Sequence, residues 1–345
     1  MENRVWLVPE YLDEFKCKCG DCRNSCCGGW QIAVGMNEYF RLIGMECSEG
    51  LHRKLESAFA PVKTPSPERY RVISPNWLGK CPMQDEDGLC SLQKECGAEA
   101  LPDICCVYPR SFRKNGELLE ACGSASCEGI AELLLKTERL QFRFENLDAK
   151  PELEERDDEV FQKAELRCAR ILNDRKVPLN WRLASTCGIA CGFPVPVGRV
   201  ADGLRETLSL LEALLEECLT LEPYAKACFE RYGGDDAEKR YQNDIEALER
   251  AFPTLPTGLE NLMFNHMIFV HYPYADERIS GADAIYGFAA AYAVLRVVCA
   301  CHMAEHSSFD DLVDAVSAVF HLTEHTPFYY NARVIRPDAG ALLSL

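Results

Sequence analysis

The sequence predicts a mainly α-helical protein in which an irregular, cysteine-rich, metal-binding N-terminal lobe precedes an α-helical bundle. Thirteen of the twenty cysteines fall between Cys17 and Cys127. Apolar residues recur at three- and four-residue steps mainly beyond residue 160, which is the helical period. A chain of 345 residues is long for a single core. We therefore expect a cysteine-rich lobe over residues 1–135, an acidic connection over 136–160 and a helical lobe over 161–345.

Charge and hydropathy indicate which kinds of partner and which cellular location to expect for the protein. A net charge of −17 argues against a nucleic-acid partner, because phosphate binding requires clustered Lys and Arg. The opening "MENRVWLVPEYLDEFKC" lacks the apolar core of a signal peptide. The longest strongly apolar stretch, Ala284 to Leu295, is shorter than the roughly 20 residues that span a bilayer. We expect a cytoplasmic protein without a membrane partner, where dense cysteines bind metal more often than they form disulfides.

The first lobe is expected to contain few regular elements. The segment "PVKTPSPERYRVISPNW" has four prolines and is expected to be extended or turn. Short helices are predicted near "GMNEYFRLIG" and at "GIAELLLKTERL". The acidic, proline-broken run from Glu145 to Glu159 is expected to form a surface connection between the lobes.

The second lobe is expected to be a helical bundle. Leu204, Leu208 and Leu211 follow the helical period behind Asp202, which is placed as an N-cap. "GGDD" ends one helix and begins the next, which stops before Pro253. "LENLMFNHMIFVHY" and "ADAIYGFAAAYAVLRVVCACHMAEH" are apolar on nearly every face, which indicates buried central helices. The last long helix opens with Ser308 and Asp311 at capping-box spacing.

The clustered cysteines come in four blocks, "CKCGDCRNSCC", "CPMQDEDGLC", "CCVYPR" and "ACGSASC". The first histidine after His52 is His266, so a metal in this lobe would have an all-thiolate shell. Thiolates in this number suit zinc or an iron–sulfur cluster. Only Cys19 and Cys22 have the paired spacing of a zinc ribbon, and the irregular gaps favour a cluster whose ligands converge from separate loops. Zinc, or buried reduced thiols without metal, are the alternatives.

The blocks and their flanks resemble one known family. "FKCKCGDCRNSCCGGWQI", "CPMQDEDGLCSLQKECGAEALPDICCVYPRSF" and "LLEACGSASCEGIAELLL" are similar to the flagellin lysine-N-methylases in order, spacing and flanking residues. The similarity continues more weakly through "VPLNWRLAS", "ENLMFNHMIFVHYPY" and "FHLTEHTPFYY". Proteins with the same N-terminal pattern are also described more widely as zinc- or iron-chelating.

The resemblance implies transfer of a methyl group from S-adenosylmethionine to lysine ε-amines of a protein substrate, with a required iron–sulfur cluster of the [4Fe-4S] type. The substrate would be flagellin or another protein with exposed lysines. The family cysteines correspond here to Cys17, Cys22, Cys26, Cys27, Cys81, Cys90, Cys105 and Cys127. Cys19, Cys96, Cys106 and Cys122 are additions to that pattern. Eight ligands exceed the four of one cubane cluster, so either two centres exist or half of these thiols are structural or reactive.

Methylation requires a neutral lysine amine, whose reference pKa is about 10.4. The candidates for the base are Asp85, Glu86 and Tyr108, and Arg110 is a candidate for binding the cofactor's carboxylate. The opposing interpretation makes the Asp-Glu-Asp run a solvated turn and Arg110 a structural partner.

The apolar helices of the second lobe supply two more candidates. Asn265 is a candidate for cofactor binding, although a satisfied polar group of the core is the simpler interpretation. His325 is placed among the catalytic candidates, because the family also has a Glu-His pair there.

Two other functions are compatible with the sequence. His302–Glu305–His306 and His321–Glu324–His325 both fit H-x-x-E-H, in which two histidines bind zinc and the glutamate is the base of a hydrolase. The third possibility is a non-catalytic protein that chelates zinc or iron or carries electrons. Binding of S-adenosylmethionine separates the methylase from this last class.

Overall fold

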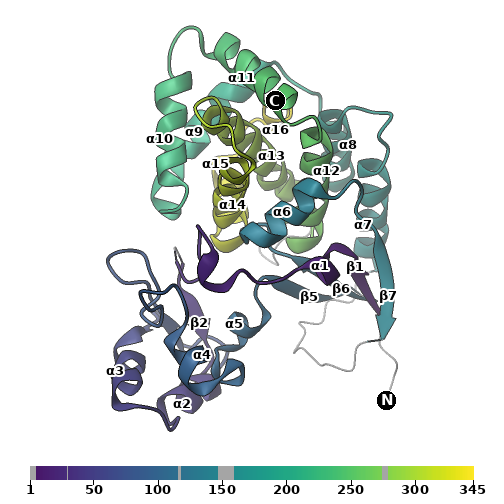
Figure 1. The fold of residues 1–345 in the computed structure, drawn as a ribbon. Coiled ribbons are helices and arrows are strands. Elements are labelled where there is room, and N and C mark those ends of the chain that lie inside the picture. Colours follow the sequence, from purple (N-terminus) through teal and green to yellow (C-terminus); the bar gives the residue numbers. More distant parts are fainter. Residues whose placement is uncertain (1–4, 29, 116–117, 147–158, 274–278) are drawn as a thin grey trace. The chain divides into compact units, whose positions relative to one another are not determined.

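The structure, a computed structural model, describes residues 5–28, 30–115, 118–146, 159–273 and 279–345. Within these residues the protein is mainly α-helical, as predicted, and it divides into two compact units (Figure 1). Lys16–Tyr108 form the first, which we call the cysteine-rich unit. Met1–Phe15 and Pro109–Leu345 together form the second, the helical unit.

The division differs from the one expected near residue 135 because of a sheet in the helical unit. Its strand order is β5-β6-β1-β7, where β1 pairs in parallel with β6 and the other two pairings are antiparallel. The strands are β1 (Val5–Pro9), β5 (Arg110–Asn115), β6 (Leu118–Gly123) and β7 (Phe142–Asn146). Since β1 hydrogen-bonds to strands beyond residue 109, the first residues fold with the later part of the chain. The expected acidic connection lies largely in 147–158, outside the described residues.

The helices of the helical unit cover most of the remaining chain. They are α1 (Tyr11–Glu14), α6 (Glu128–Lys136), α7 (Glu159–Leu172), α8 (Leu179–Cys191), α9 (Val200–Ala213), η3 (Leu215–Glu217), α10 (Glu222–Tyr232), α11 (Ala237–Ala251), α12 (Leu255–Phe269), α13 (Gly281–Met303), α14 (Phe309–His325), α15 (Phe328–Ile335) and α16 (Ala339–Leu342). Both apolar segments predicted to be central, α12 and α13, are buried along nearly their whole length.

Helix α13 is the centre of the bundle, with α8, α9, α10, α11, α14, α15 and α16 packed around it (Figure 1). By length and composition it could cross a membrane, and it is the one such helix found among the described residues. Its apolar window is 89% buried inside the structure, as befits a core helix. Its apolar character on all faces therefore reflects neighbours on all sides.

The ends of several helices lie where the sequence predicted. Helix α10 ends and α11 begins on either side of "GGDD", and Tyr241 of α11 is buried. Ser308 caps α14 in a reciprocal capping box with Asp311. The prediction of Asp202 as an N-cap was wrong, since α9 begins at Val200 and Asp202 lies in its first turn. A carboxylate is favourable there because it faces the positive end of the helix dipole.

The cysteine-rich unit is more regular than expected. It contains η1 (Cys19–Asp21), β2 (Ile32–Val34), α2 (Met36–Ile43), α3 (Glu49–Ala58), β3 (Phe59–Pro61), β4 (Arg71–Ile73), α4 (Ser91–Cys96), η2 (Ala98–Ala100) and α5 (Asp103–Val107), and its three-stranded sheet has the antiparallel order β2-β4-β3. Leu42, Leu55 and Leu92 are fully buried members of its own small core. Cys47, Cys81, Cys90, Cys96 and Cys105 pack against that core.

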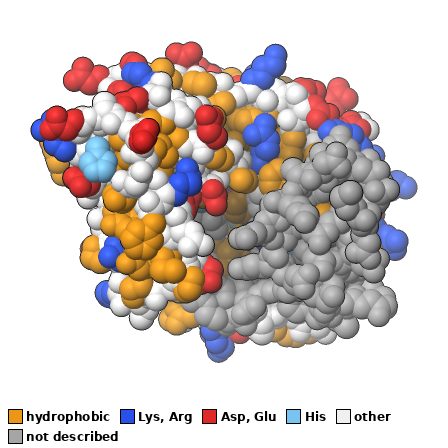
Figure 2. Space-filling view, turned by 90° about the horizontal axis from the view of Figure 1, so that it is seen from below, with side chains coloured by type: hydrophobic (Ala, Val, Ile, Leu, Met, Phe, Trp, Pro, Cys, Tyr) orange, Lys and Arg blue, Asp and Glu red, His pale blue; other side chains and the backbone are white. Residues whose placement is uncertain are grey.

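Charges of both signs are mixed on the part of one face that Figure 2 colours by type. On the face shown in Figure 2, Asp and Glu side chains are interspersed with Lys, Arg and hydrophobic ones. Trp77 and Leu78 are the neighbouring exposed hydrophobic side chains of the cysteine-rich unit, at 90% and 58% exposed. The net charge of −17 is thus not gathered into a single acidic patch on this face.

Candidate metal centre

Four of the predicted cysteine ligands come together in the cysteine-rich unit. Burial is the main cause that raises the pKa of Cys81 and Cys105, and the charges of neighbouring members of the group add to it. The four come from three segments of the chain, which are the end of the first block, the loop of the second block and helix α5. We call this group, Cys27, Cys81, Cys90 and Cys105, the thiol cluster.

Backbone hydrogen bonds hold the thiol cluster in place. The Cys81 amide donates to the carbonyl of Cys27, and an isolated bridge joins Gly28 to Lys80 beside it. A second bridge joins Gln84 to Cys90 and closes the Cys81–Cys90 loop. Cys90 is also the N-cap residue of α4. The loop and the end of the first block are therefore fixed to one another before any metal binds.

The first cysteine block also lies against this loop. A Cβ atom at Gly20 would meet the Asp87 carbonyl oxygen at 2.7 Å, and a Cβ atom at Gly88, where φ is +77°, would meet the Gly20 carbonyl oxygen at 3.0 Å. Glycine is required at Gly88 because other residues rarely adopt that backbone conformation. Cys17 and Cys22 flank Gly20, so the segment that carries them runs beside the loop.

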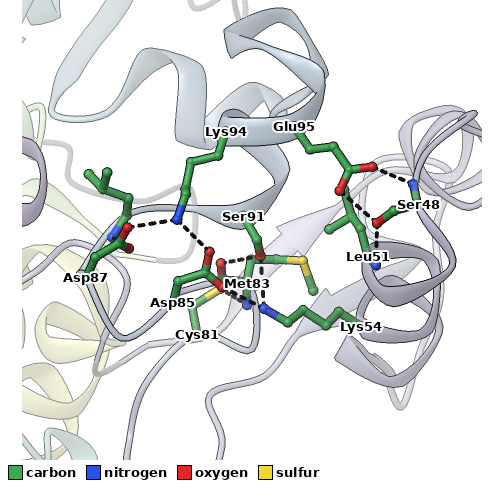
Figure 3. Close-up of polar contacts among 11 residues, drawn as sticks. Ser48, Leu51, Lys54, Cys81, Met83, Asp85, Asp87, Ser91, Lys94 and Glu95 are labelled. Atoms are coloured by element: carbon green, nitrogen blue, oxygen red, sulfur yellow. Dashed lines mark hydrogen bonds and ion pairs between the residues drawn. The ribbon is translucent and has the colours of Figure 1, made fainter.

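Ion pairs brace the same loop. Asp85 lies between two lysines, with Oδ1 2.7 Å from the amine of Lys54 and Oδ2 3.1 Å from the amine of Lys94 (Figure 3). Lys94 also pairs with Asp87 at 2.7 Å. Hydrogen bonds from the two lysines lower the pKa of Asp85. The contacts of Asp85 are thus those of a residue with a structural role. Glu86 beside it is exposed.

The environment of the thiol cluster favours the protonated thiol at three of its members, Cys81, Cys90 and Cys105. Burial raises the pKa of Cys81 to about 11 and raises the pKa of Cys90 and Cys105 as well. A hydrogen bond with Cys26 has the opposite effect on Cys27 and lowers its pKa to about 7. Four half-buried thiols with one small core beside them fit a metal centre, because a bound cation offsets the cost of ionising them.

The other predicted ligands have different surroundings. Cys17 is exposed, and its sulfur accepts the Cys19 amide at 3.3 Å. Cys26 is exposed and Cys22 half-buried. Cys127 belongs to the helical unit, where it is the N-cap residue of α6. The members of the thiol cluster thus lie in one region of the cysteine-rich unit, and metal binding by all eight cysteines stays a prediction.

Two more predicted site residues, one in each unit, stand close together in the sequence, where the first unit ends at Tyr108 and the second resumes at Pro109. Tyr108 follows α5 in the cysteine-rich unit, with its ring centroid 5.4 Å from that of Trp30. Arg110 opens β5 in the helical unit, where its guanidinium lies over the Phe15 ring at 5.1 Å. The aromatic contact fits the structural interpretation of Arg110, and cofactor binding by it stays a prediction.

A second polar site, buried in the helical unit, surrounds His325. The Nε2 atom of His325 lies 2.8 Å from the Ser126 hydroxyl and 3.1 Å from that of Ser124. Ser124 also donates to Glu324 Oε2 at 2.6 Å. Burial lowers the pKa of His325 to about 3, so its imidazole is neutral at pH 7. Chemically, such a group can accept or relay a proton from a hydroxyl.

The same network extends to helix α12 and the sheet. Glu324 Oε1 lies 3.3 Å from His266 Nδ1, and His266 Nε2 lies 3.0 Å from the Tyr329 hydroxyl. Asn265 donates to the Gly123 carbonyl at 2.7 Å and accepts from Tyr11. Both ends of the Asn265 amide are therefore engaged within the protein, as a satisfied core polar group would be.

Sequence reasoning missed Ser124, Ser126 and Tyr329 as parts of this site. A signal was available in "ACGSASC", where two serines stand between cysteines, and in the polar residues of otherwise apolar helices. The pairing itself joins residues about two hundred positions apart and leaves no local pattern.

Together, the fold and the thiol cluster define a mainly helical protein with a candidate thiolate metal centre. No protein-family model matches the chain, and no solved structure matches it. Over 135 residues, or 39% of its length, the chain is 26% identical to proteins named lysine-N-methylase from Salmonella choleraesuis (strain SC-B67) and Salmonella typhimurium (strain LT2). It covers 33% of each, so it spans about a third of the length of these relatives. It is also 25% identical to the flagellar biosynthetic protein FliU of Salmonella muenchen, 79% of which it covers.

Proposed function

We propose that the protein is a lysine N-methyltransferase that acts on a protein substrate, uses S-adenosylmethionine and carries an iron–sulfur cluster in its cysteine-rich unit. The names of its relatives support lysine methylation. The thiol cluster, drawn from three of the four cysteine blocks and held by backbone hydrogen bonds and one small core, supports the metal centre. Flagellin is one candidate substrate, since one relative is named for flagellar biosynthesis, and a cytoplasmic location stays part of the proposal.

Cys27, Cys81, Cys90 and Cys105 would hold the cluster, with one thiolate for each iron of a [4Fe-4S] centre. Such a cluster supplies a redox-active centre whose potential depends on burial and on hydrogen bonds to its sulfurs. In this unit the Met83 amide lies 3.5 Å from the Cys81 sulfur, and the buried core covers one side of the group. The ion pairs of Asp85 would hold the loop in the binding geometry.

The chemistry at lysine requires removal of a proton from the ammonium before the nitrogen can attack a methyl carbon. The carboxylate of Asp85 is occupied by two lysines, which makes it a weak base. Tyr108 and Glu86 of the cysteine-rich unit and His325 of the helical unit stay candidates for that role. His325 is neutral at pH 7, but a pKa of about 3 makes it a weak base, and the Ser126 hydroxyl lies 2.8 Å from its Nε2 atom.

Iron and sulfide analysis of anaerobically purified protein tests the cluster. We expect a brown protein with both elements present, and loss of colour in Cys81→Ser and Cys105→Ser. Cys19→Ser is the matched control, because this cysteine is exposed, lies in the first block and is outside the predicted ligand set. Colourless protein with stoichiometric zinc would instead support the non-catalytic chelating protein.

Incubation with labelled S-adenosylmethionine and candidate lysine-bearing proteins tests the reaction. Label transferred to lysine, and dependent on Cys81 and Cys105, is the expected result. An iron-loaded protein that neither binds the cofactor nor transfers label would contradict the enzymatic part of the proposal and leave the metal centre standing.

A further inference from the structure

Three potential metal ligands meet at the turn between α13 and α14. One ligand atom from each of His302, His306 and Asp311 lies within 4.8 Å of the other two. All three belong to the helical unit. We call this group the turn site. It shares no residue with the thiol cluster.

The fold prepares each ligand of the turn site. His302 lies in the last turn of α13, and its ring centroid is 4.9 Å from that of Tyr224 and 4.0 Å from that of His306. Asp311 lies in the first turn of α14, where its Oδ2 accepts the Ser308 amide at 3.0 Å and the Ser308 hydroxyl at 2.6 Å. These bonds orient the carboxylate and leave further lone pairs for a cation, since a carboxylate has about four acceptor positions. Ordered carboxylates of this kind are typical around protein metal sites.

The turn site combines two nitrogen ligands with one oxygen ligand. His306 lies at the surface and Asp311 is half-buried, so the turn site is open to solvent on one side. Two imidazoles and a carboxylate are a ligand set that zinc adopts with a fourth position left for water.

The structure departs from the H-x-x-E-H pattern at its glutamate. The side chain of Glu305 is 77% exposed, and its Oε1 lies 4.0 Å from a guanidinium nitrogen of Arg231. Arg231 is itself held by Asp244, at 2.6 Å and 2.7 Å. Glu305 therefore faces an arginine, while Asp311, five residues after the motif, completes the group of three.

We propose that His302, His306 and Asp311 bind a zinc ion that joins the end of α13 to the beginning of α14. The proposal concerns a second metal site and does not depend on the methyltransferase. Because the ligands flank the turn on both sides, the ion would fasten the central helix to its neighbour. The open position would hold water.

Cobalt titration of the full chain tests the turn site, because cobalt substitutes for zinc and reports its ligands by colour. Binding at the thiol cluster gives intense charge-transfer bands, whereas binding by imidazole and carboxylate gives only weak ligand-field bands. We expect the weak component in the wild-type protein, with displacement by zinc. His306→Ala and Asp311→Asn should weaken it by more than about tenfold, which is the least that losing even an outer partner of a metal ligand costs.

Two variants serve as matched controls. Glu305→Gln should bind as the wild type does, because this glutamate faces Arg231, and a loss of binding there would make Glu305 a ligand and overturn the proposed set of three. His52→Ala removes another exposed imidazole with a glutamate beside it and should change nothing. Absence of the weak component from the wild type, or its persistence in both His306→Ala and Asp311→Asn, would overturn the proposal. Circular dichroism of each variant checks that the fold is retained.

Discussion

The amine of Lys54 lies 2.7 Å from Oδ1 of Asp85, and this ion pair ties helix α3 to the loop between two members of the thiol cluster (Figure 3). Lys94 of α4 reaches the other carboxylate oxygen at 3.1 Å. One side chain thereby joins two helices to the Cys81–Cys90 loop. Since both lysines are partly exposed, the pair contributes more to the position of the loop than to the stability of the unit.

Asp85→Asn is therefore expected to lower metal retention without unfolding the protein. The amide keeps the size of the side chain but loses the charge that holds both lysines, so iron content after gel filtration should fall, though less than in Cys81→Ser. Glu49→Gln, which removes an exposed ion pair with Arg53 in the same unit, is the control. Equal iron content in Asp85→Asn and the wild type would show that the loop needs no such brace.

The pKa shift of Asp85 also predicts a dependence on pH. Because its folded-state pKa is lowered, the ion pairs favour the folded state above the ordinary aspartate pKa of about 3.9, and their effect is lost as the pH falls through the lowered value. Wild type and Asp85→Asn should thus converge in metal retention at acidic pH. Iron release followed between about pH 6 and pH 3 measures this.

The close packing around Gly287 of α13 predicts that a larger residue at this position destabilises the protein. A Cβ atom there would meet a ring carbon of Tyr329 at 2.3 Å. Gly287→Ala should lower the free energy of unfolding by about 1–3 kcal/mol, the usual cost of forcing an extra methyl group into a packed core. Denaturant unfolding measures the change. Gly234→Ala is the control, since nothing lies within 4 Å of a Cβ at that position, and comparable losses in both variants would contradict the argument.

The sequence predicted those features that depend on local patterns. All-round apolar segments identified α12 and α13 as central, and the spacing of Ser308 and Asp311 identified the capping box. The cysteine blocks contain every member of the thiol cluster, and metal binding by these residues stays a prediction. These features can be recognised from the sequence because the residues that define a helical period, a cap or a ligand block lie within a few positions of one another.

Features that depend on distant pairings were not predictable in this way. The boundary of the units follows from β1 pairing with β6, and nothing in "VWLVP" indicates its partner. The network of Ser126 and His325 likewise joins a loop to a helix far along the chain. Asp202 failed as an N-cap because a carboxylate also suits the first turn, where it bonds to Arg199 and Arg205.

Removal of the Glu260 charge is expected to cause a large loss of stability. Its carboxylate lies 2.7 Å from a guanidinium nitrogen of Arg182 and 2.8 Å from one of Arg175, and both Glu260 and Arg182 are buried. Glu260→Gln leaves the Arg182 charge buried without a counter-ion, which should cost about 3–5 kcal/mol in unfolding free energy. Glu222→Gln removes a pair of similar length with Lys226 on the exposed surface of α10, and should cost less than about 0.5 kcal/mol. Similar costs for the two variants would contradict the role of burial.

The lowered pKa of His325 predicts how the free energy of unfolding changes with pH. Burial lowers its folded-state pKa to about 3 and that of His321 to about 4, whereas the unfolded value is about 6.5. As the pH falls, both histidines therefore bind their protons at a higher pH in the unfolded state than in the folded state. The free energy of unfolding is highest above about pH 6.5 and falls by about 1.4 kcal/mol per pH unit for each histidine below it, which amounts to about 2 kcal/mol each by pH 5.

His325→Gln should flatten this slope, because the amide still meets Ser124 and Ser126 but takes up no proton in this range. His52→Gln, at a half-exposed helical position, should keep the wild-type slope. Urea unfolding at pH 7, 6 and 5 measures all three proteins. A slope in His325→Gln as steep as that of the wild type would mean that His325 takes up its proton equally in the folded and unfolded states, so that burial does not lower its pKa.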